Sequence, residues 1–323
     1  MSVRCRTAAL AAFVLVISAC GNEASTSSPS FTQRHTATAT PSTSVPPTQS
    51  AVHGIVTIVT SATEVRVGII DQVAGTYAHI ATFTVRAGIE VTDLDHGVPV
   101  DAIHQFSHDF NRLAAVRNDA VGWIDHHGTF TNATSAITQT PFRPRVVQWD
   151  PAFDDDDNFY FIEGESKLSG NATRVVAAGA HDASASTVIE KGTVLTGPNG
   201  KPIEVADFSC AAPGSGRFLR DWLDPQHYIS YDPTRFGSGT SHEVAVVPFD
   251  PNANSDCAVG QNLLPADNPN TILAAVGSPR GEAVVVQAGG ALYLITVADK
   301  VVTRIAVAAN TLPASSYIVI GWR

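Results

Sequence analysis

The sequence has little charge, few cysteines and no apolar run long enough to cross a membrane. Only 15% of its 323 residues are charged, and the acidic residues outnumber the basic ones by 30 to 20. The resulting net charge of −10 repels the phosphate backbone of nucleic acids, so we expect no nucleic-acid partner. The 4 cysteines form no CxxC pair, and this argues against a zinc site.

Signatures of catalysis are also missing. No GxSxG, HExxH or Walker A pattern occurs, so a binding protein is expected rather than an enzyme. Ser241-His242-Glu243 contains the residue types of a catalytic triad, but the members of a triad meet by folding and not by adjacency. His126 and His127 follow a predicted strand, where neighbours point to opposite faces, so we do not expect them to share a metal.

The N-terminus has the pattern of a signal peptide. Arg4 and Arg6 precede an uncharged stretch, residues 8–19, that is shorter than the about 20 residues of a spanning helix. Ile17-Ser18-Ala19-Cys20 resembles the bacterial lipobox. The resemblance implies that residues 1–19 are removed and that acyl chains such as palmitate anchor the protein by Cys20. The alternative is an ordinary signal peptide that contains Cys20.

Residues 20–52 are rich in Ser, Thr and Pro and contain almost no large apolar residue. Such a segment cannot bury enough surface to offset its ordering entropy, so we predict a disordered tether after Cys20. Beyond it, Cys210 and Cys257 are the only cysteines. In an oxidising compartment they are predicted to form a disulfide, and the alternative is two unpaired buried thiols.

Residues 53–323 read as an all-β domain. Runs of Val, Ile and Thr at 55–60 and 65–70 indicate two strands, and the best helix candidate is only residues 217–223. A layout of turn, strand, tight turn and strand recurs, which indicates a repeat protein; the copies are 55–70, 106–125, 152–170, 223–250 and 277–296. The tryptophans are predicted to pack between strands; they are Trp123, Trp149, Trp222 and Trp322.

Two of these turns, Phe106-Ser107-His108-Asp109 and Ser278-Pro279-Arg280-Gly281, resemble the turn that precedes the inner hairpin in TolB-type β-propellers. The resemblance implies a β-propeller over residues 53–323, and the repeat spacing predicts about six blades, one of them near 186–208. The final run, 315–323, is predicted to pair with 54–60 and close the ring. The rival architectures are a β-sandwich or two β domains.

The most acidic spot is the turn at 153–158. Alternate side chains converge in a turn that enters a strand, so Asp154 and Asp156, or Asp155 and Asp157, are candidate calcium ligands. The alternative is a solvated acidic turn. No other cofactor is indicated.

Together these patterns predict a lipid-anchored protein on the extracytoplasmic face of the cell membrane. Its β-propeller would serve as a binding or scaffolding module for an envelope protein or a small ligand. Two alternatives remain, a calcium-dependent, lactonase-like hydrolase and a solute-binding lipoprotein, although the latter usually needs alternating strands and helices.

Overall fold

A computed structural model of the chain describes residues 53–91, 102–134, 147–164, 172–177, 187–190, 194–205, 219–231, 242–252, 259–265, 267–308 and 317–323. Cys20, Cys210 and Cys257 lie outside these ranges, as do the predicted signal peptide and tether, so their roles stay predictions. Residues 49–323 form one compact unit. No helix in the described ranges is long and apolar enough to cross a bilayer.

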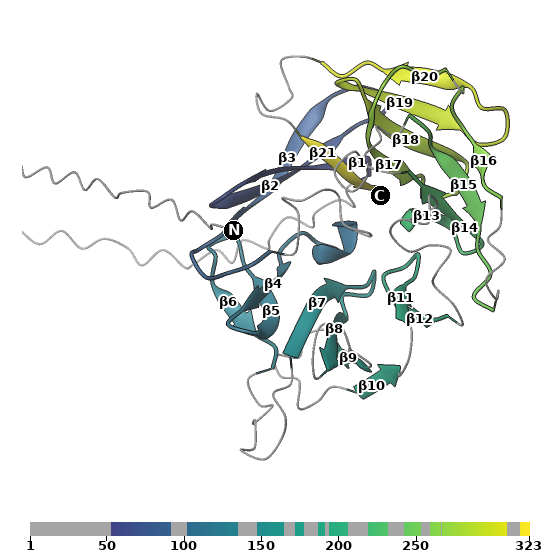
Figure 1. Cartoon of the computed structure of the whole chain (residues 1–323). Coiled ribbons are helices and arrows are strands. Elements are labelled where there is room, and N and C mark those ends of the chain that lie inside the picture. Colours follow the sequence, from purple (N-terminus) through teal and green to yellow (C-terminus); the bar gives the residue numbers. More distant parts are fainter. Residues whose placement is uncertain are drawn as a thin grey trace, which may run out of the picture. The chain divides into compact units, whose positions relative to one another are not determined.

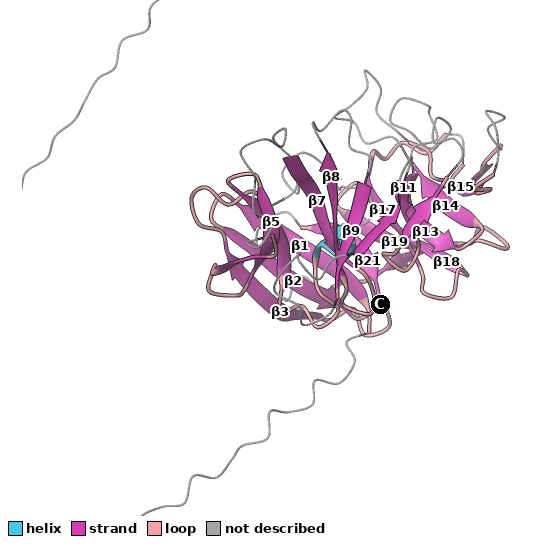
Figure 2. Cartoon of the chain, turned by 90° about the horizontal axis from the view of Figure 1, so that it is seen from below, coloured by secondary structure: helices cyan, strands magenta, loops and turns pink. Residues whose placement is uncertain are grey.

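The unit consists of antiparallel sheets that are arranged around a central axis, as in a β-propeller (Figures 1 and 2). We call the sheets blades 1 to 5 in chain order. Blade 1 contains β21 (Ile318–Trp322), β1 (Ile55–Ser61), β2 (Glu64–Ile70) and β3 (Tyr77–Thr84). Blade 2 contains β4 (Leu113–Arg117), β5 (Ala120–Ile124) and β6 (Phe130–Asn132), and the 3-10 helix η1 (Ala102–Gln105) precedes it.

Blade 3 contains β7 (Val147–Phe153), β8 (Phe159–Gly164), β9 (Ala172–Val176) and β10 (Thr187–Glu190). Blade 4 contains β13 (Leu219–Asp224), β14 (His227–Ser230), β15 (Ala245–Pro248) and β16 (Gln261–Asn262). Blade 5 contains β17 (Ile272–Gly277), β18 (Ala283–Ala288), β19 (Ala291–Thr296) and β20 (Val302–Ile305). A two-stranded hairpin, β11 (Val194–Thr196) and β12 (Pro202–Glu204), lies between blades 3 and 4 in the chain.

The all-β propeller prediction is confirmed, but the prediction of six blades is wrong, because the described residues form five. In the described part of 186–208, the expected extra blade is replaced by β10, which is the outer strand of blade 3, and by the β11–β12 hairpin. The prediction of a sixth blade rested on the long spacing between the repeats on either side of this segment. The radial sheets also differ from a β-sandwich and from the two-lobed α/β architecture of solute-binding proteins.

The weak helix prediction for 217–223 is wrong as well. Leu219–Asp224 form β13, whose residues pair with β14 and pack against β17. Short segments with good helix formers take the conformation that buries them, and here the tertiary contacts of an inner strand decide. Bulges between Leu219 and Asp221 and between Trp222 and Asp224 blur the alternating pattern that would have identified the strand.

The last described strand closes the ring, as predicted. β21 pairs with β1 so that Ile55 faces Trp322 and Val56 faces Gly321. The backbone of Gly54 continues this pairing with Arg323, since each amide donates to the other residue's carbonyl oxygen, at 2.6 and 3.0 Å. The inner strand of blade 1 therefore comes from one end of the domain and its other three strands from the opposite end.

Apolar side chains are buried in separate clusters between neighbouring blades. One cluster joins blades 1 and 2, and another joins blades 5 and 1. Trp123 of blade 2 packs against Phe153 and Phe159 of blade 3, with ring centroids 6.2 and 5.2 Å apart. Because the core lies between blades, the axis remains available for a polar cavity.

Candidate functional site

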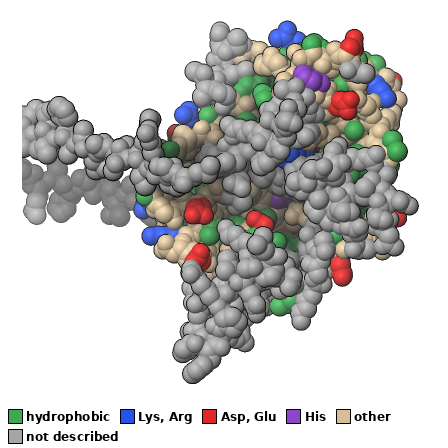
Figure 3. All heavy atoms as spheres, viewed as in Figure 1, with side chains coloured by type: hydrophobic (Ala, Val, Ile, Leu, Met, Phe, Trp, Pro, Cys, Tyr) green, Lys and Arg blue, Asp and Glu red, His purple; other side chains and the backbone are tan. Residues whose placement is uncertain are grey.

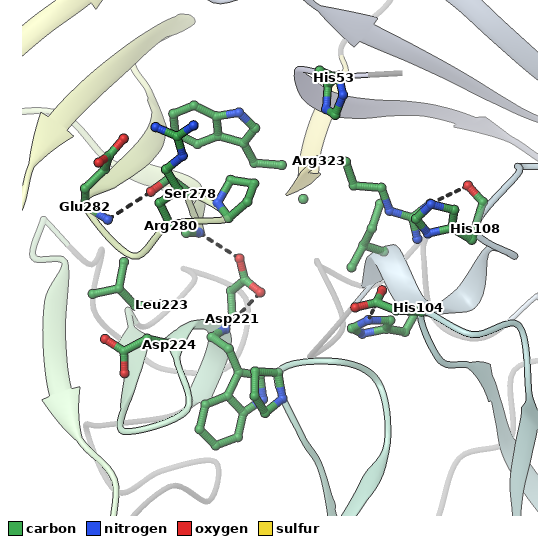
Figure 4. Close-up of a pocket in the computed structure, with 18 of the residues that line it drawn as sticks. His53, His104, His108, Asp221, Leu223, Asp224, Ser278, Arg280, Glu282 and Arg323 are labelled. Carbon is green, nitrogen blue, oxygen red and sulfur yellow. Dashed lines mark hydrogen bonds and ion pairs between the residues drawn. The ribbon is translucent and has the colours of Figure 1, made fainter. Parts of the chain in front are cut away.

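Loops from all five blades gather at one end of the axis and line a cavity of about 1290 Å³, which we call the channel mouth (Figure 4). Every blade and the β11–β12 hairpin contribute to it. Their contributions include His53 and Arg323 from blade 1, His108 and Asp109 from blade 2, Asp155 from blade 3, Pro198 from the hairpin, Asp224 and Pro225 from blade 4, and Pro279 and Arg280 from blade 5.

Serine side chains hold two of these turns in shape. The Ser107 hydroxyl donates to Asp109 at 2.7 Å and accepts the backbone amide of Arg112 at 2.9 Å. The Ser278 hydroxyl accepts the backbone amides of Glu282 and Ala283, both at 3.1 Å. These serines belong to the two turns whose sequences resemble TolB-type turns, so the sequence motif located the channel mouth without revealing its function.

Carboxylates outnumber guanidinium groups in the lining of the channel mouth. The carboxylates are Asp109, Asp155, Asp221, Asp224 and Glu282, the guanidinium groups are Arg280 and Arg323, and the histidines are His53, His104 and His108. Figure 4 shows Asp221, Arg280 and Glu282 on one side of the cavity and His104, His108 and Arg323 on the other.

The side of the cavity with His104, His108 and Arg323 contains several charged groups in contact with one another. Arg323 donates from Nη1 to the His108 carbonyl oxygen at 2.8 Å, and its guanidinium carbon lies 4.8 Å from the centre of the Phe110 ring. Burial lowers the pKa of Arg323, and the nearby charges of Asp155, Asp157 and Asp109 oppose that effect. Arginine nevertheless remains charged at any physiological pH.

His104 is 5% exposed, and its Nε2 lies 3.5 Å from Oδ1 of Asp155. Burial raises the pKa of Asp155, but the hydrogen bond from His104 and the charges of His104, Arg323 and His108 outweigh it, so the pKa is lower than usual. Nδ1 of His104 is buried and has no hydrogen-bond partner among the described residues. A buried polar atom without a partner is costly, so this nitrogen marks a place where a hydrogen-bond partner from water or a ligand is needed.

On the first side, Asp221 is the most perturbed carboxyl group. Its Oδ2 accepts the amide of Gly277 from β17 at 2.8 Å, and its Oδ1 accepts the amide of Trp222 at 2.9 Å. Burial raises the pKa of Asp221 to about 7, although these two hydrogen bonds act in the opposite direction. Asp221 therefore changes its charge near neutral pH at the wall of the channel mouth.

Glycine at position 277 is what allows this contact. A Cβ atom at Gly277 would lie 2.4 Å from the carbonyl oxygen of Trp222, so the inner strands of blades 4 and 5 could not approach as closely with any other residue. The same close approach brings the Gly277 amide within reach of Asp221. No sequence pattern identified Asp221, because a lone Asp in a short bulged strand carries no recognisable motif.

The predicted calcium ligands have other partners. Asp154 is 1% exposed; its Oδ1 accepts the amides of Asp156 and Asn158, and its Oδ2 accepts the side chains of Asn158 and Tyr160. Asp156 is exposed and lies 2.7 Å from Nζ of Lys201. Among the described residues, no group of three or more His, Cys, Asp or Glu side chains is placed to hold a metal. Calcium at Asp154 and Asp156 stays a prediction.

The other histidines named from the sequence, His126, His127 and His242, do not line the channel mouth. His126 is within hydrogen-bond distance of the Thr82 carbonyl oxygen and the Asn111 side chain, both at 3.2 Å. The His127 carbonyl oxygen accepts a hydrogen bond from Arg86. Nδ1 of His242 lies 3.0 Å from the Asn270 carbonyl oxygen, and Ser241 is outside the described residues.

No protein-family model matches the chain, and no curated protein matches it. Among solved structures, a candidate TolB protein from Agrobacterium tumefaciens is 10% identical over 76% of this chain and 90% of its own, with a TM-score of 0.41. Hydrazine synthase from Kuenenia stuttgartiensis is 13% identical over 72% and 73% of the two chains, with a TM-score of 0.33. The WD40 domain of SCAP from fission yeast is 12% identical over 81% and 57%, with a TM-score of 0.26. The radial sheets themselves identify the β-propeller, and these similarities carry no information about ligand or activity.

Proposed function

We propose that the protein is a lipid-anchored binding module of the cell envelope and that its ligand binds in the channel mouth. One observation carries the second part: a single cavity of about 1290 Å³ is lined by all five blades and the extra hairpin. Ligand sites in proteins are usually concave, largely preformed and few in number. The prolines of three adjacent turns, Pro198, Pro225 and Pro279, limit the freedom of the rim and therefore the entropy lost on binding.

The first part rests on the sequence of the leader, Ile17-Ser18-Ala19-Cys20. Growth of expressing cells with a radioactive or clickable palmitate should label the protein and place it in the membrane fraction. The variant Cys20→Ser should lose both the label and the membrane association. Membrane association that survives this change without any label would contradict lipid anchoring at Cys20.

The binding site is tested by photo-crosslinking in cells. A photoreactive amino acid at Arg280, which is exposed and lines the channel mouth, should give discrete crosslinked products. The matched control carries the same amino acid at Arg304, which is exposed on the outer strand β20. Equal product patterns from both positions, or products from Arg304 alone, would contradict a ligand in the channel mouth.

A second candidate function, hydrolysis, is favoured by the state of Asp221. A carboxyl group with a pKa near the working pH can act as a general base toward water. If the protein hydrolyses lactones, the rate should rise with pH through about 7 and fall at least 100-fold in Asp221→Asn. The assay is release of acid from a panel of sugar lactones, with and without calcium. Absence of turnover in both conditions would eliminate this candidate and leave the binding function intact.

A further inference from the structure

We propose that the ligand of the channel mouth carries an ammonium or guanidinium group and that its binding releases a proton from Asp221. This inference rests on the proposed function, because it specifies what the same cavity binds. It adds two properties that the fold alone does not imply: a preference for cations, and a dependence on pH that is assigned to one residue.

The preference for cations follows from the charges of the lining. Its carboxylates outnumber its guanidinium groups, and Arg323 is already engaged with the His108 carbonyl oxygen and the Phe110 ring. Figure 3 shows both acidic and basic side chains on the described part of the face in view, so the excess of acidic groups is a property of the cavity lining. A negative surface around a cavity with low-dielectric walls raises the local concentration of cations and speeds their association.

Asp221 is placed to receive such a charge. Two backbone amides hold its carboxyl group in one orientation, and each oxygen accepts only one hydrogen bond from the described residues, so the ionised group has further lone pairs for a ligand. Among the described residues, no cationic side chain forms an ion pair with it. The β13 bulges on both sides of Asp221 are the kind of irregularity that redirects a side chain toward a site.

Several charged or titratable groups surround Asp221 and must be considered with it. On its own hairpin these are Arg220, Asp224, His227 and Tyr231, and from blade 5 they are Arg280 and Glu282. Across the cavity lie His53, His104, His108, Asp109, Asp155 and Arg323. Arg220 is directed to Tyr231, where its Nε donates to the carbonyl oxygen at 3.3 Å, and His227 is bound to Asp224 at 2.9 Å.

His104 is a second polar group of the lining, and one of its ring nitrogens lacks a partner among the described residues. In the neutral tautomer that donates from Nε2 to Asp155, its Nδ1 is a buried acceptor without a donor among the described residues. An ammonium or guanidinium group supplies several donors at once, and His104 lies on the side of the cavity opposite Asp221 (Figure 4).

The size of the pH effect follows from linkage. Below pH 7 the folded protein holds a proton on Asp221, and a bound cation must displace it. If the cation binds only the ionised form, the Kd should fall about tenfold between pH 6 and pH 8. At pH 6.5 binding should release about three-quarters of a proton.

The test uses the full chain in a non-ionic detergent and three peptides as probes: tri-lysine, tri-lysine acetylated on every side-chain amine, and tri-glutamate. Isothermal titration at pH 6 and pH 8 should show that tri-lysine binds at least ten times more tightly than the other two and about tenfold more tightly at pH 8. Titrations at pH 6.5 in two buffers of different ionisation enthalpy count the released protons. Asp221→Asn should remove the proton release and most of the pH dependence, whereas Glu282→Gln should weaken binding and keep both.

Each other result overturns the inference in a distinct way. Equal binding of acetylated tri-lysine or tri-glutamate would disprove the preference for cations, and a Kd that does not change with pH would disprove the role of Asp221. If no peptide binds while crosslinks still form at Arg280, the inference is wrong and the proposed function stands. If the crosslinks are also missing, both are wrong. Should Asp221→Asn fail to fold, release of less than half a proton from the unmodified protein would by itself refute the role of Asp221.

Discussion

Replacement of Asp221 by Asn should change how the stability of the protein depends on pH. The pKa of this carboxyl is about 7 in the folded protein, against a usual value of 3.8. A raised carboxyl pKa means that the folded state keeps a proton that the unfolded state has already released. The associated stability is fully present below about pH 4 and is lost as the pH rises toward 7.

The magnitude follows from the shift of about three pKa units. At about 1.4 kcal/mol per unit, ionisation of Asp221 costs the folded protein about 4 kcal/mol, of which about 2 kcal/mol develops between pH 5 and pH 7. The Asn side chain cannot ionise, so the unfolding free energy of the variant does not include this pH-dependent cost. It also replaces one of the two acceptor oxygens, which costs about 1–3 kcal/mol at every pH. The difference in unfolding free energy between the two proteins should therefore change by about 2 kcal/mol from pH 5 to pH 7, in favour of the Asp221→Asn variant.

The assay is urea unfolding of both proteins in steps of half a pH unit, followed by tryptophan fluorescence. In a thermal experiment the same change corresponds to about 4 °C in Tm. Glu282→Gln is the matched control, because it removes an exposed carboxyl from the same cavity. All other groups titrate alike in the compared proteins. If the unfolding free energies of Asp221→Asn and of the unmodified protein differ by the same amount at every pH, burial does not raise the pKa of Asp221.

Three further outcomes are expected. Gly277→Ala should destabilise the domain by more than 2 kcal/mol in urea unfolding, because its Cβ would clash with the backbone of Trp222; a smaller loss would show that blades 4 and 5 can separate. Asp154→Ala should cost at least 3 kcal/mol, because it removes a buried carboxylate that accepts four hydrogen bonds, one of them from the buried Tyr160 hydroxyl. Asp156→Ala should cost less than about 1 kcal/mol, and similar losses from the two changes would contradict the burial of Asp154. Excess calcium tests the prediction of a metal at Asp154 and Asp156. Because Asp154 already accepts four hydrogen bonds and Asp156 pairs with Lys201, we expect the Tm to stay within 1 °C of its value in EDTA, and a rise of several degrees would instead support a cation there.

The sequence was sufficient for the parts of the fold that depend on local patterns. Runs of β-branched residues located β1 and β2, and the final apolar run identified the strand that closes the ring. The repeated turns located the β4–β5 hairpin of blade 2 and the β18–β19 hairpin of blade 5. These features are contained in a few consecutive residues, so they can be recognised without knowledge of distant contacts.

The blade count and the candidate site depend on contacts that no local pattern contains. The length between repeats does not reveal whether a segment pairs as an outer strand, as β10 does, or forms a separate sheet. Asp221 is notable only because β17 approaches it closely enough for Gly277 to donate to it. The acidic turn was conspicuous in the sequence, yet in the structure Asp154 is inside the turn and only Asp155 lines the channel mouth.

The pairing of β1 with β21 also determines when the domain can become complete. A chain is synthesised from its N-terminus, so β1 and β2 exist long before the strand that occupies the inner position of their blade. During that interval β1 has a free edge, which is a template for pairing with other chains. Ring closure joins residues from the two ends of the domain, and contacts of such large sequence separation form slowly. The time between synthesis and closure is therefore the period in which this protein is most vulnerable to aggregation and most dependent on chaperones.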